Sequence, residues 1–217
     1  MPKKKYKAVI FDFDDTLVET REIKWAQYKF VARKFYNMDI SKKVLLEHWG
    51  KPLHTLITEI FNNVDTFENL RLAVRTERNN FLKKVYTNSV NIVNELLENN
   101  IKVGILSATD KMNLEEDLIR LGFPVDRLIA MQGEDETPVH KPNPEVFLPI
   151  FTRLKKEGIG KKEIVYIGDS LDDLKAAKEA GIGFIAVTTG LYSKADFKKH
   201  GAKAIVKDIR EVLKEIM

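Results

Sequence analysis

Cysteine is absent from this chain of 217 residues, and no apolar stretch approaches the roughly 20 residues that a membrane-spanning helix requires. The lack of cysteine excludes disulfides, zinc–thiolate sites and a cysteine nucleophile. It also fits a reducing compartment. The basic start of the chain has only a short apolar stretch that runs into aspartates, which is unlike a secretory signal. We therefore expect a cytoplasmic protein with no membrane partner.

Charged residues are abundant, at 31% of the chain, and the formal net charge is +4. With 44% hydrophobic residues, the composition is that of a globular protein. Residues 17–88 carry 13 Lys or Arg against 8 Asp or Glu, whereas residues 89–217 carry 19 against 21. The basic residues are dispersed and form no aromatic-interleaved stripe, so we expect no nucleic-acid partner. The basic segment is either a solvated helical surface or a surface that attracts anions.

Apolar runs and helical patterns alternate along most of the chain. Strands are predicted at residues 7–13, 101–106, 127–131, 163–167, 184–188 and 204–206. Helices are predicted after Asn88 or Ser89 and at residues 111–121, 144–156, 171–180 and 209–216, with Asp110 and Ser170 as N-caps and Gly181 as a stop. This alternation with short connections predicts a Rossmann-like α/β fold, a parallel sheet with helices on both faces.

Residues 17–88 interrupt this alternation. Helical patterns cover residues 21–36, 41–49, 53–61 and 67–85, and no strand is predicted among them. We expect the aromatic residues of the first helix to form the core of this insertion, namely Trp25, Tyr28, Phe30, Phe35 and Tyr36. The predicted domains are therefore a Rossmann-like core of residues 1–16 and 89–217 and an all-helical subdomain of residues 17–88.

Polar residues follow several predicted strands at the point where each one ends. The first strand leads into DFDDT at residues 12–16, the second into SATD at 107–110 and the fourth into GDSLDD at 168–173, while HKPNP occupies 140–144. In open parallel sheets, sites lie beyond the carboxyl ends of the strands. Close carboxylates repel one another unless a cation holds them, and oxygen ligands favour Mg²⁺. We predict a Mg²⁺ site there, with an acidic turn as the alternative for residues 12–16.

These motifs resemble, in order and in position, those of the haloacid dehalogenase-like hydrolase superfamily. The matching residues are Asp12-x-Asp14-x-Thr16-Leu17, Ser107, Lys141 in a Lys-Pro-x-Pro setting, and Gly168-Asp169-x-x-x-Asp173. The chain is most similar to the phosphoglycolate phosphatase and β-phosphoglucomutase subgroup. Members of that subgroup carry a helical cap between the first and second motifs, which is the place of residues 17–88 in this chain.

The resemblance implies a role for each motif residue. Asp12 would be the nucleophile that forms an aspartyl-phosphate, and Asp14 would be the general acid and base. Lys141 would offset the charge of the nucleophile and of the phosphoryl group, while Ser107 and the amide of Ala108 would hold a phosphoryl oxygen. The implied metal ligands are Asp12, Asp14 with its backbone carbonyl, Asp169 and Asp173, the last of which would act directly or as an outer-shell partner. From the residues alone, Ser107 is alternatively a loop-starting residue and Asp173 a helix-surface charge.

Three positions are informative when this chain is compared with the family it resembles. Asp15 stands where the family often has glycine, and we expect its side chain to point to solvent or to a helix end. Ala108 stands where asparagine often follows the hydroxyl, which leaves only its amide for phosphate. Asp14 favours an oxygen leaving group, because members that cleave carbon–halogen bonds typically lack an acid at that position.

We therefore predict a Mg²⁺-dependent phosphatase that hydrolyses a small phosphorylated metabolite, as a monomer or homodimer. The alternatives are a phosphomutase of the same superfamily, a 2-haloacid dehalogenase and a non-catalytic anion-binding module. In the cap, Lys51 and Arg21 are candidates for substrate contact, and plain surface charges are the alternative. Thr109 and Lys111 are further candidates beside the phosphate.

Overall fold

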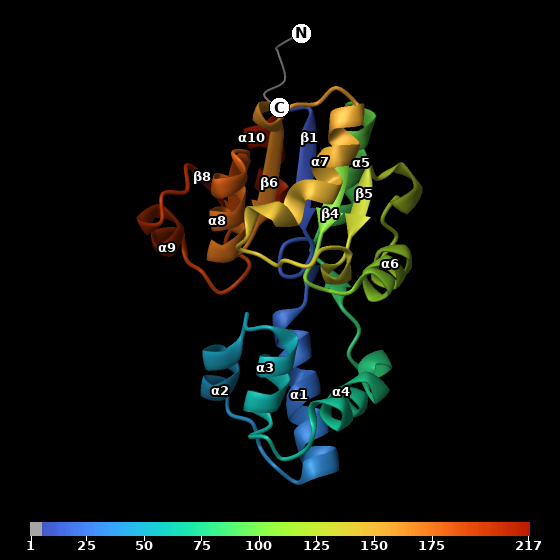
Figure 1. Ribbon diagram of the computed structural model, residues 1–217, viewed down its shortest axis with the longest axis vertical. Coiled ribbons are helices and arrows are strands. Elements are labelled where there is room, and N and C mark those ends of the chain that lie inside the picture. The colour runs from blue at the N-terminus through green and yellow to red at the C-terminus, as the bar shows by residue number, and fades with distance from the viewer. Residues whose placement is uncertain (1–5) are drawn as a thin grey trace. The chain divides into compact units, whose positions relative to one another are not determined.

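The computed structural model describes residues 6–217, which form two compact units (Figure 1). The first unit joins the chain up to Glu19 with Lys84–Met217, and the second unit is Thr20–Lys83. The sequence placed the corresponding boundaries after residue 16 and after residue 88.

A six-stranded parallel sheet lies at the centre of the first unit, with the strand order β5-β4-β1-β6-β7-β8. The strands are β1 (Ala8–Asp12), β4 (Lys102–Leu106), β5 (Ala130–Gln132), β6 (Ile164–Gly168), β7 (Gly183–Val187) and β8 (Ala204–Val206). All five residues of β1 are buried, as expected for an apolar run that is covered on both faces. Because β1 pairs with both β4 and β6, the ends of these three strands lie side by side.

Helices cover both faces of this sheet (Figure 1). They are α5 (Ser89–Glu98), α6 (Lys111–Arg120), α7 (Leu148–Lys156), α8 (Leu171–Ala180), α9 (Lys194–Lys199) and α10 (Leu213–Ile216). The short 3-10 turns of this unit are η2 (Val125–Arg127), η3 (Glu134–Glu136), η4 (Pro144–Phe147), η5 (Lys161–Glu163) and η6 (Ile209–Glu211). Within residues 6–217, none of the helices combines the length and the apolar character needed to cross a bilayer.

Successive residues of β1 point to opposite faces and so divide the core in two. Val9 and Phe11 pack in one apolar cluster with side chains from α5, α6 and α10. Ala8 and Ile10 pack in a second cluster with side chains from η4, α7 and α8. The predicted Rossmann-like α/β core with helices on both faces is thereby confirmed.

The predicted N-caps and the predicted stop residue occur at the helix ends of this unit. The side chains of Asp110 and Ser170 accept the backbone N–H groups of the third residue of α6 and of α8, respectively. Gly181 ends α8 in the left-handed conformation, with a φ of 76°. The strand predicted at 127–131 begins only at Ala130, because η2 occupies residues 125–127.

The second unit is helical and has its own apolar core. It contains α1 (Arg21–Tyr36), α2 (Lys42–His48), α3 (Leu53–Ile60), α4 (Phe67–Thr76) and η1 (Arg78–Asn80). The core includes Trp25 and Tyr28, as predicted. The prediction was wrong for Phe30 and Phe35, which are 42% and 45% exposed. Their rings instead lie beneath the ammonium of Lys34, which is about 5 Å from each centroid.

The helix predicted over residues 67–85 was too long, and the predicted absence of strands over 17–88 was wrong. The helix α4 ends at Thr76, and β3 (Lys84–Val85) pairs antiparallel with β2 (Val18–Glu19). The amide of Tyr86 and the hydroxyl of Ser89 both donate to the carbonyl of Leu17. These long-range hydrogen bonds hold the returning chain extended, and a helical pattern read from neighbouring residues does not reveal them.

The packing of the core predicts a large loss of stability at Phe147 and almost none at its neighbour Leu148. Phe147 is fully buried between the sheet and α7, whereas Leu148 is 56% exposed. We expect Phe147→Ala to lower the free energy of unfolding by about 3–5 kcal/mol, because it leaves a cavity. The matched control Leu148→Ala is expected to change it by about 0.5 kcal/mol or less. Denaturant unfolding of both variants measures this, and equal losses would contradict the assignment of the core face.

Candidate active site

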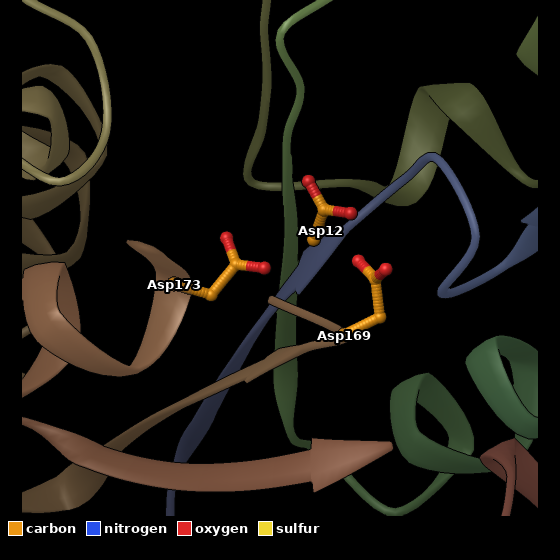
Figure 2. A group of neighbouring side chains, drawn as sticks. All are labelled: Asp12, Asp169 and Asp173. Carbon is orange, nitrogen blue, oxygen red and sulfur yellow. The ribbon is translucent and has the colours of Figure 1, made fainter. Parts of the chain in front are cut away.

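Three aspartates gather at the carboxyl edge of the sheet. Asp12 ends β1, Asp169 follows the end of β6, and Asp173 lies in the first turn of α8. One carboxylate oxygen from each lies within 4.8 Å of the others. Figure 2 shows the three side chains around a shared space. The parallel pairing of β1 with β6 brings them together, since it places the two strand ends side by side.

The amino group of Lys141 lies between two of these carboxylates. Its Nζ is 2.7 Å from Oδ1 of Asp12 and 2.7 Å from Oδ1 of Asp173. The lysine side chain is only 15% exposed, so the ion pairs are little screened by water. The loop that carries Lys141 leads into η4, where Asn143 accepts the amide of Glu145 as N-cap. The structure thus brings together Asp12, Lys141, Asp169 and Asp173, which the sequence predicted for one site.

The electrostatics of this cluster favour a bound cation. Burial raises the pKa of Asp12 to about 7, against the opposing effect of Lys141 and with further increases from Asp173 and Asp14. Burial, followed by the charge of Asp12, also holds the pKa of Asp169 well above its ordinary value. Burial by itself lowers the pKa of Lys141, but the two neighbouring carboxylates outweigh it and hold that pKa well above its ordinary value. One ammonium does not offset the clustered acids, so a divalent cation would relieve the remaining repulsion.

The donor set fits a hard divalent cation such as Mg²⁺. Asp12 and Asp169 offer carboxylate oxygens, and the cluster of candidate ligands contains no nitrogen or sulfur donor. Asp173 is less available, because Oδ1 accepts from Lys141 and Tyr166 while Oδ2 accepts the amide and the hydroxyl of Ser170. Asp12 and Asp169 are therefore the carboxylates best placed to hold the ion.

Asp14 lies beside two hydroxyl groups from the loop after β4. Its Oδ2 accepts from Oγ of Ser107 at 3.0 Å and from Oγ1 of Thr109 at 2.9 Å. The amide of Thr109 donates in turn to Oγ of Ser107 at 2.9 Å. Thr109 therefore contacts the predicted acid–base residue. Lys111 does not share this arrangement, since its ammonium bonds the carbonyl of Met131 and, at 3.0 Å, Glu136.

The expectation that Asp15 points to solvent or to a helix end was wrong. The residue is 5% exposed and has a φ of 53°, in the left-handed region that glycine adopts without strain. The hydroxyl of Thr189 donates to its carbonyl, and its charge contributes to the raised pKa of Asp169. The tight turn after β1 thus folds Asp15 inward, under the loop that follows β7.

That loop contains a residue that the sequence motifs did not identify. A Cβ on Gly190 would lie 1.8 Å from Oδ2 of Asp169 and 2.9 Å from its Cβ. The absence of a side chain therefore makes room for the carboxylate of Asp169. The only signal in the sequence was the position of Thr189 and Gly190 just beyond the carboxyl end of β7.

The two cap candidates lie in the helical unit. The ammonium of Lys51, between α2 and α3, is 2.6 Å from a carboxylate oxygen of Glu59 and 2.9 Å from Nδ1 of His48. The guanidinium carbon of Arg21 lies 5.6 Å from the ring centroid of Trp25. Both side chains are therefore held by neighbours within the helical unit.

Comparison with known proteins places this geometry in context. The family model described as haloacid dehalogenase-like hydrolase matches residues 9–187. A phosphorylated carbohydrates phosphatase of Thermotoga maritima is 29% identical over 97% of this chain and 99% of its own length. The pyrophosphatase PpaX of Bacillus velezensis is 26% identical over 83% of this chain and 82% of its own length. Among solved structures, a Thermotoga maritima protein provisionally assigned as a β-phosphoglucomutase superposes with a TM-score of 0.81 at 26% identity, covering 97% of this chain and 100% of that one.

The raised pKa values predict how pH and Mg²⁺ act together on stability. Without metal, Asp12 and Asp169 keep protons that the unfolded chain releases near its ordinary pKa of about 4. The contribution of Asp12 to the free energy of unfolding is full below that pH and is lost as pH rises through about 7, and the raised pKa of Asp169 acts in the same direction. Because protons and Mg²⁺ compete for the same oxygens, we expect Mg²⁺ to raise Tm more at about pH 8 than at about pH 5.

Thermal unfolding with Mg²⁺ and with a chelator, at both pH values, measures this effect. Asp169→Asn is expected to remove most of the Mg²⁺ shift, whereas the exposed control Asp126→Asn is expected to retain it. A shift that is as large at the lower pH as at the higher one would contradict the prediction.

Proposed function

The chain belongs to the haloacid dehalogenase-like hydrolases, and we propose that it is a Mg²⁺-dependent phosphatase of small phosphomonoesters. The observation that carries this proposal is the buried carboxylate of Asp12, which is held by Lys141 at 2.7 Å and lies beside Asp169. A second acid, Asp14, stands two residues further along and bonds two hydroxyl groups. A carboxylate held in one orientation next to an acid suits attack on phosphorus followed by protonation of the leaving oxygen.

The reaction consists of two displacements at phosphorus. An oxygen of Asp12 attacks the phosphorus atom, the bond to the substrate oxygen breaks, and Asp14 gives its proton to that leaving oxygen. Asp14 then takes a proton from a water molecule, which attacks the phosphorus of the aspartyl-phosphate. The bond between phosphorus and Asp12 breaks, and inorganic phosphate and the free carboxylate are released.

Three groups of the chain hold the phosphoryl group in this scheme. Lys141 offsets the negative charge that Asp12 and the phosphoryl oxygens share. The hydroxyl of Ser107 gives up its bond to Asp14 and, together with the amide of Ala108, donates to a phosphoryl oxygen, while Thr109 keeps its bond to Asp14. Asp12, Asp169 and the backbone carbonyl of Asp14 would hold Mg²⁺, which supplies further neutralisation of phosphoryl charge.

The helical unit serves as the cap in this proposal. Residues 17–88 carry 13 basic against 8 acidic side chains, which suits the attraction of an anionic substrate. Lys51 and Arg21 are the proposed substrate contacts. The relative that acts on phosphorylated carbohydrates supports a sugar phosphate as the substrate class. Cytoplasmic location and the monomeric or homodimeric state stay predictions.

Substitution of the two acids tests the chemistry. We expect Asp12→Asn to lower kcat on an aryl phosphate by at least about 10³-fold, since it removes the nucleophile. Asp14→Asn is expected to lower kcat more on an alkyl phosphate than on the aryl phosphate, because a poorer leaving group needs the proton more. Steady-state kinetics with Mg²⁺ and with chelator measures both effects, with Asp126→Asn as the exposed acidic control.

Full activity in Asp12→Asn would remove the proposed nucleophile. Absence of phosphomonoester hydrolysis by the folded, Mg²⁺-loaded protein would instead favour the non-catalytic alternative. Transfer of the phosphoryl group to a second hydroxyl of a sugar phosphate would identify a phosphomutase.

The cap assignment predicts an effect that depends on the substrate. We expect Lys51→Ala to raise KM for a sugar phosphate by about tenfold, the effect of losing one contact of about 1.4 kcal/mol. The kcat on a small aryl phosphate should stay within about twofold of the wild type, because that substrate lacks the contacted part. A substrate panel measures this, and Lys43→Ala, an exposed lysine of α2, is the matched control. An unchanged panel would show that Lys51 does not select the substrate.

A further inference from the structure

The hydroxyl of Tyr166 completes a buried ring of hydrogen bonds around Lys141. Tyr166 lies on β6, is fully buried, and donates its proton to Oδ1 of Asp173 at 2.9 Å. The same hydroxyl oxygen accepts from Nζ of Lys141 at 3.1 Å. Lysine offers three donor hydrogens, and the acceptors here are Asp12, Asp173 and Tyr166. The hydroxyl is the uncharged member of this set.

We infer that Tyr166 is a positioning residue, which orients the ammonium of Lys141 toward Asp12 through its bonds to Lys141 and Asp173. This inference rests on the proposed function, in which Lys141 acts on Asp12 and on the phosphoryl group. The hydroxyl of Tyr166 bonds Lys141 and Asp173 and neither Asp12 nor Asp169, so it acts through the lysine and not on the two carboxylates best placed to hold the ion.

The ring of Tyr166 is well held, which fixes the position of its hydroxyl. It packs edge-on against Phe147, with 5.0 Å between centroids, and is tilted against Phe184 at 6.2 Å. A tyrosine with two packed neighbours has little freedom to move its oxygen. The hydroxyl therefore acts as a fixed point for the flexible side chain of Lys141.

Asp173 is held as firmly from its other side. Its Oδ2 accepts the amide of Ser170 at 3.0 Å and the hydroxyl of Ser170 at 2.6 Å. A Cβ on Gly168 would lie 2.6 Å from Cγ of Asp173, so the strand leaves a space that this carboxyl fills. Gly168 and Tyr166 alternate with Ile167 on β6 and share one face of the strand. Two residues on one face of β6 therefore position Asp173: Gly168 leaves space for its carboxyl group, and Tyr166 donates a hydrogen bond to it.

The variant Tyr166→Phe tests the inference, because it removes only the hydroxyl. We expect kcat on an aryl phosphate to fall by about 10- to 100-fold, the loss associated with one hydrogen bond to a charged group. The KM and the Mg²⁺ half-saturation should stay within about twofold, since the hydroxyl bonds neither Asp12, nor Asp169, nor the substrate. Tyr28→Phe, which removes a hydroxyl from a buried tyrosine of the helical unit, is the matched control.

A spectroscopic readout separates this inference from the proposed function. The ammonium of Lys141, identified by its loss in Lys141→Met, should give a slowly exchanging ¹H–¹⁵N signal in the wild type. In Tyr166→Phe we expect this exchange to accelerate by about tenfold or more, because one of three hydrogen bonds is gone. Gly168→Ala, which displaces Asp173 and keeps the tyrosine, should accelerate it as well.

The inference would be overturned if Tyr166→Phe changed neither the exchange rate of the Lys141 ammonium nor kcat. Faster exchange with an unchanged kcat would also overturn it, since the hydroxyl would then hold the lysine without serving the reaction. Failure of the proposed function would be distinguishable from failure of this inference, because it would appear as full activity in Asp12→Asn. The exchange measurement on Lys141 does not depend on turnover and would still report on the hydrogen bond of Tyr166.

Discussion

The ion pairs of one buried lysine are the constraint on which the rest of the site depends. Three aspartates with oxygens within 4.8 Å of one another would repel strongly if left without a counter-charge. Lys141 bonds two of them and lies on a loop about 130 residues beyond Asp12 in the chain. The geometry of Asp12 therefore depends on a contact between distant parts of the chain.

The position of β1 inside the parallel sheet explains why the candidate site lies at this edge. Its neighbours β4 and β6 deliver Ser107 and Asp169 to either side of Asp12, and each of these side chains follows the end of its strand. The turn after β1 adds Asp14 and folds Asp15 inward. Membership of the haloacid dehalogenase-like hydrolases accounts for the order of the motifs, and the sheet accounts for their convergence.

Asp12 and Asp169 were predictable, because they lie where two predicted strands end, and Lys141 was predictable from the family resemblance of its motif. The residues that shape those side chains were not predictable from local patterns. Tyr166 resembles any apolar residue of a buried strand, and Gly190 matters only because Asp169 lies next to it in space. The pairing of β2 with β3 depends in the same way on contacts between distant parts of the chain, as does the hydrogen bond from Ser89 to the carbonyl of Leu17. The exposure of Phe30 likewise follows from tertiary packing and not from helical periodicity.

The central claim is that the phosphoryl group is transferred to Asp12 before water removes it. Rapid quenching of the Mg²⁺-loaded enzyme with substrate, followed by acid proteolysis and mass spectrometry, measures this most directly. We predict one phosphorylated peptide that contains Asp12, formed within the first turnover and absent from Asp12→Asn. Product formation in the first turnover without any phosphorylated peptide, or with the phosphoryl group on another residue, would contradict the account.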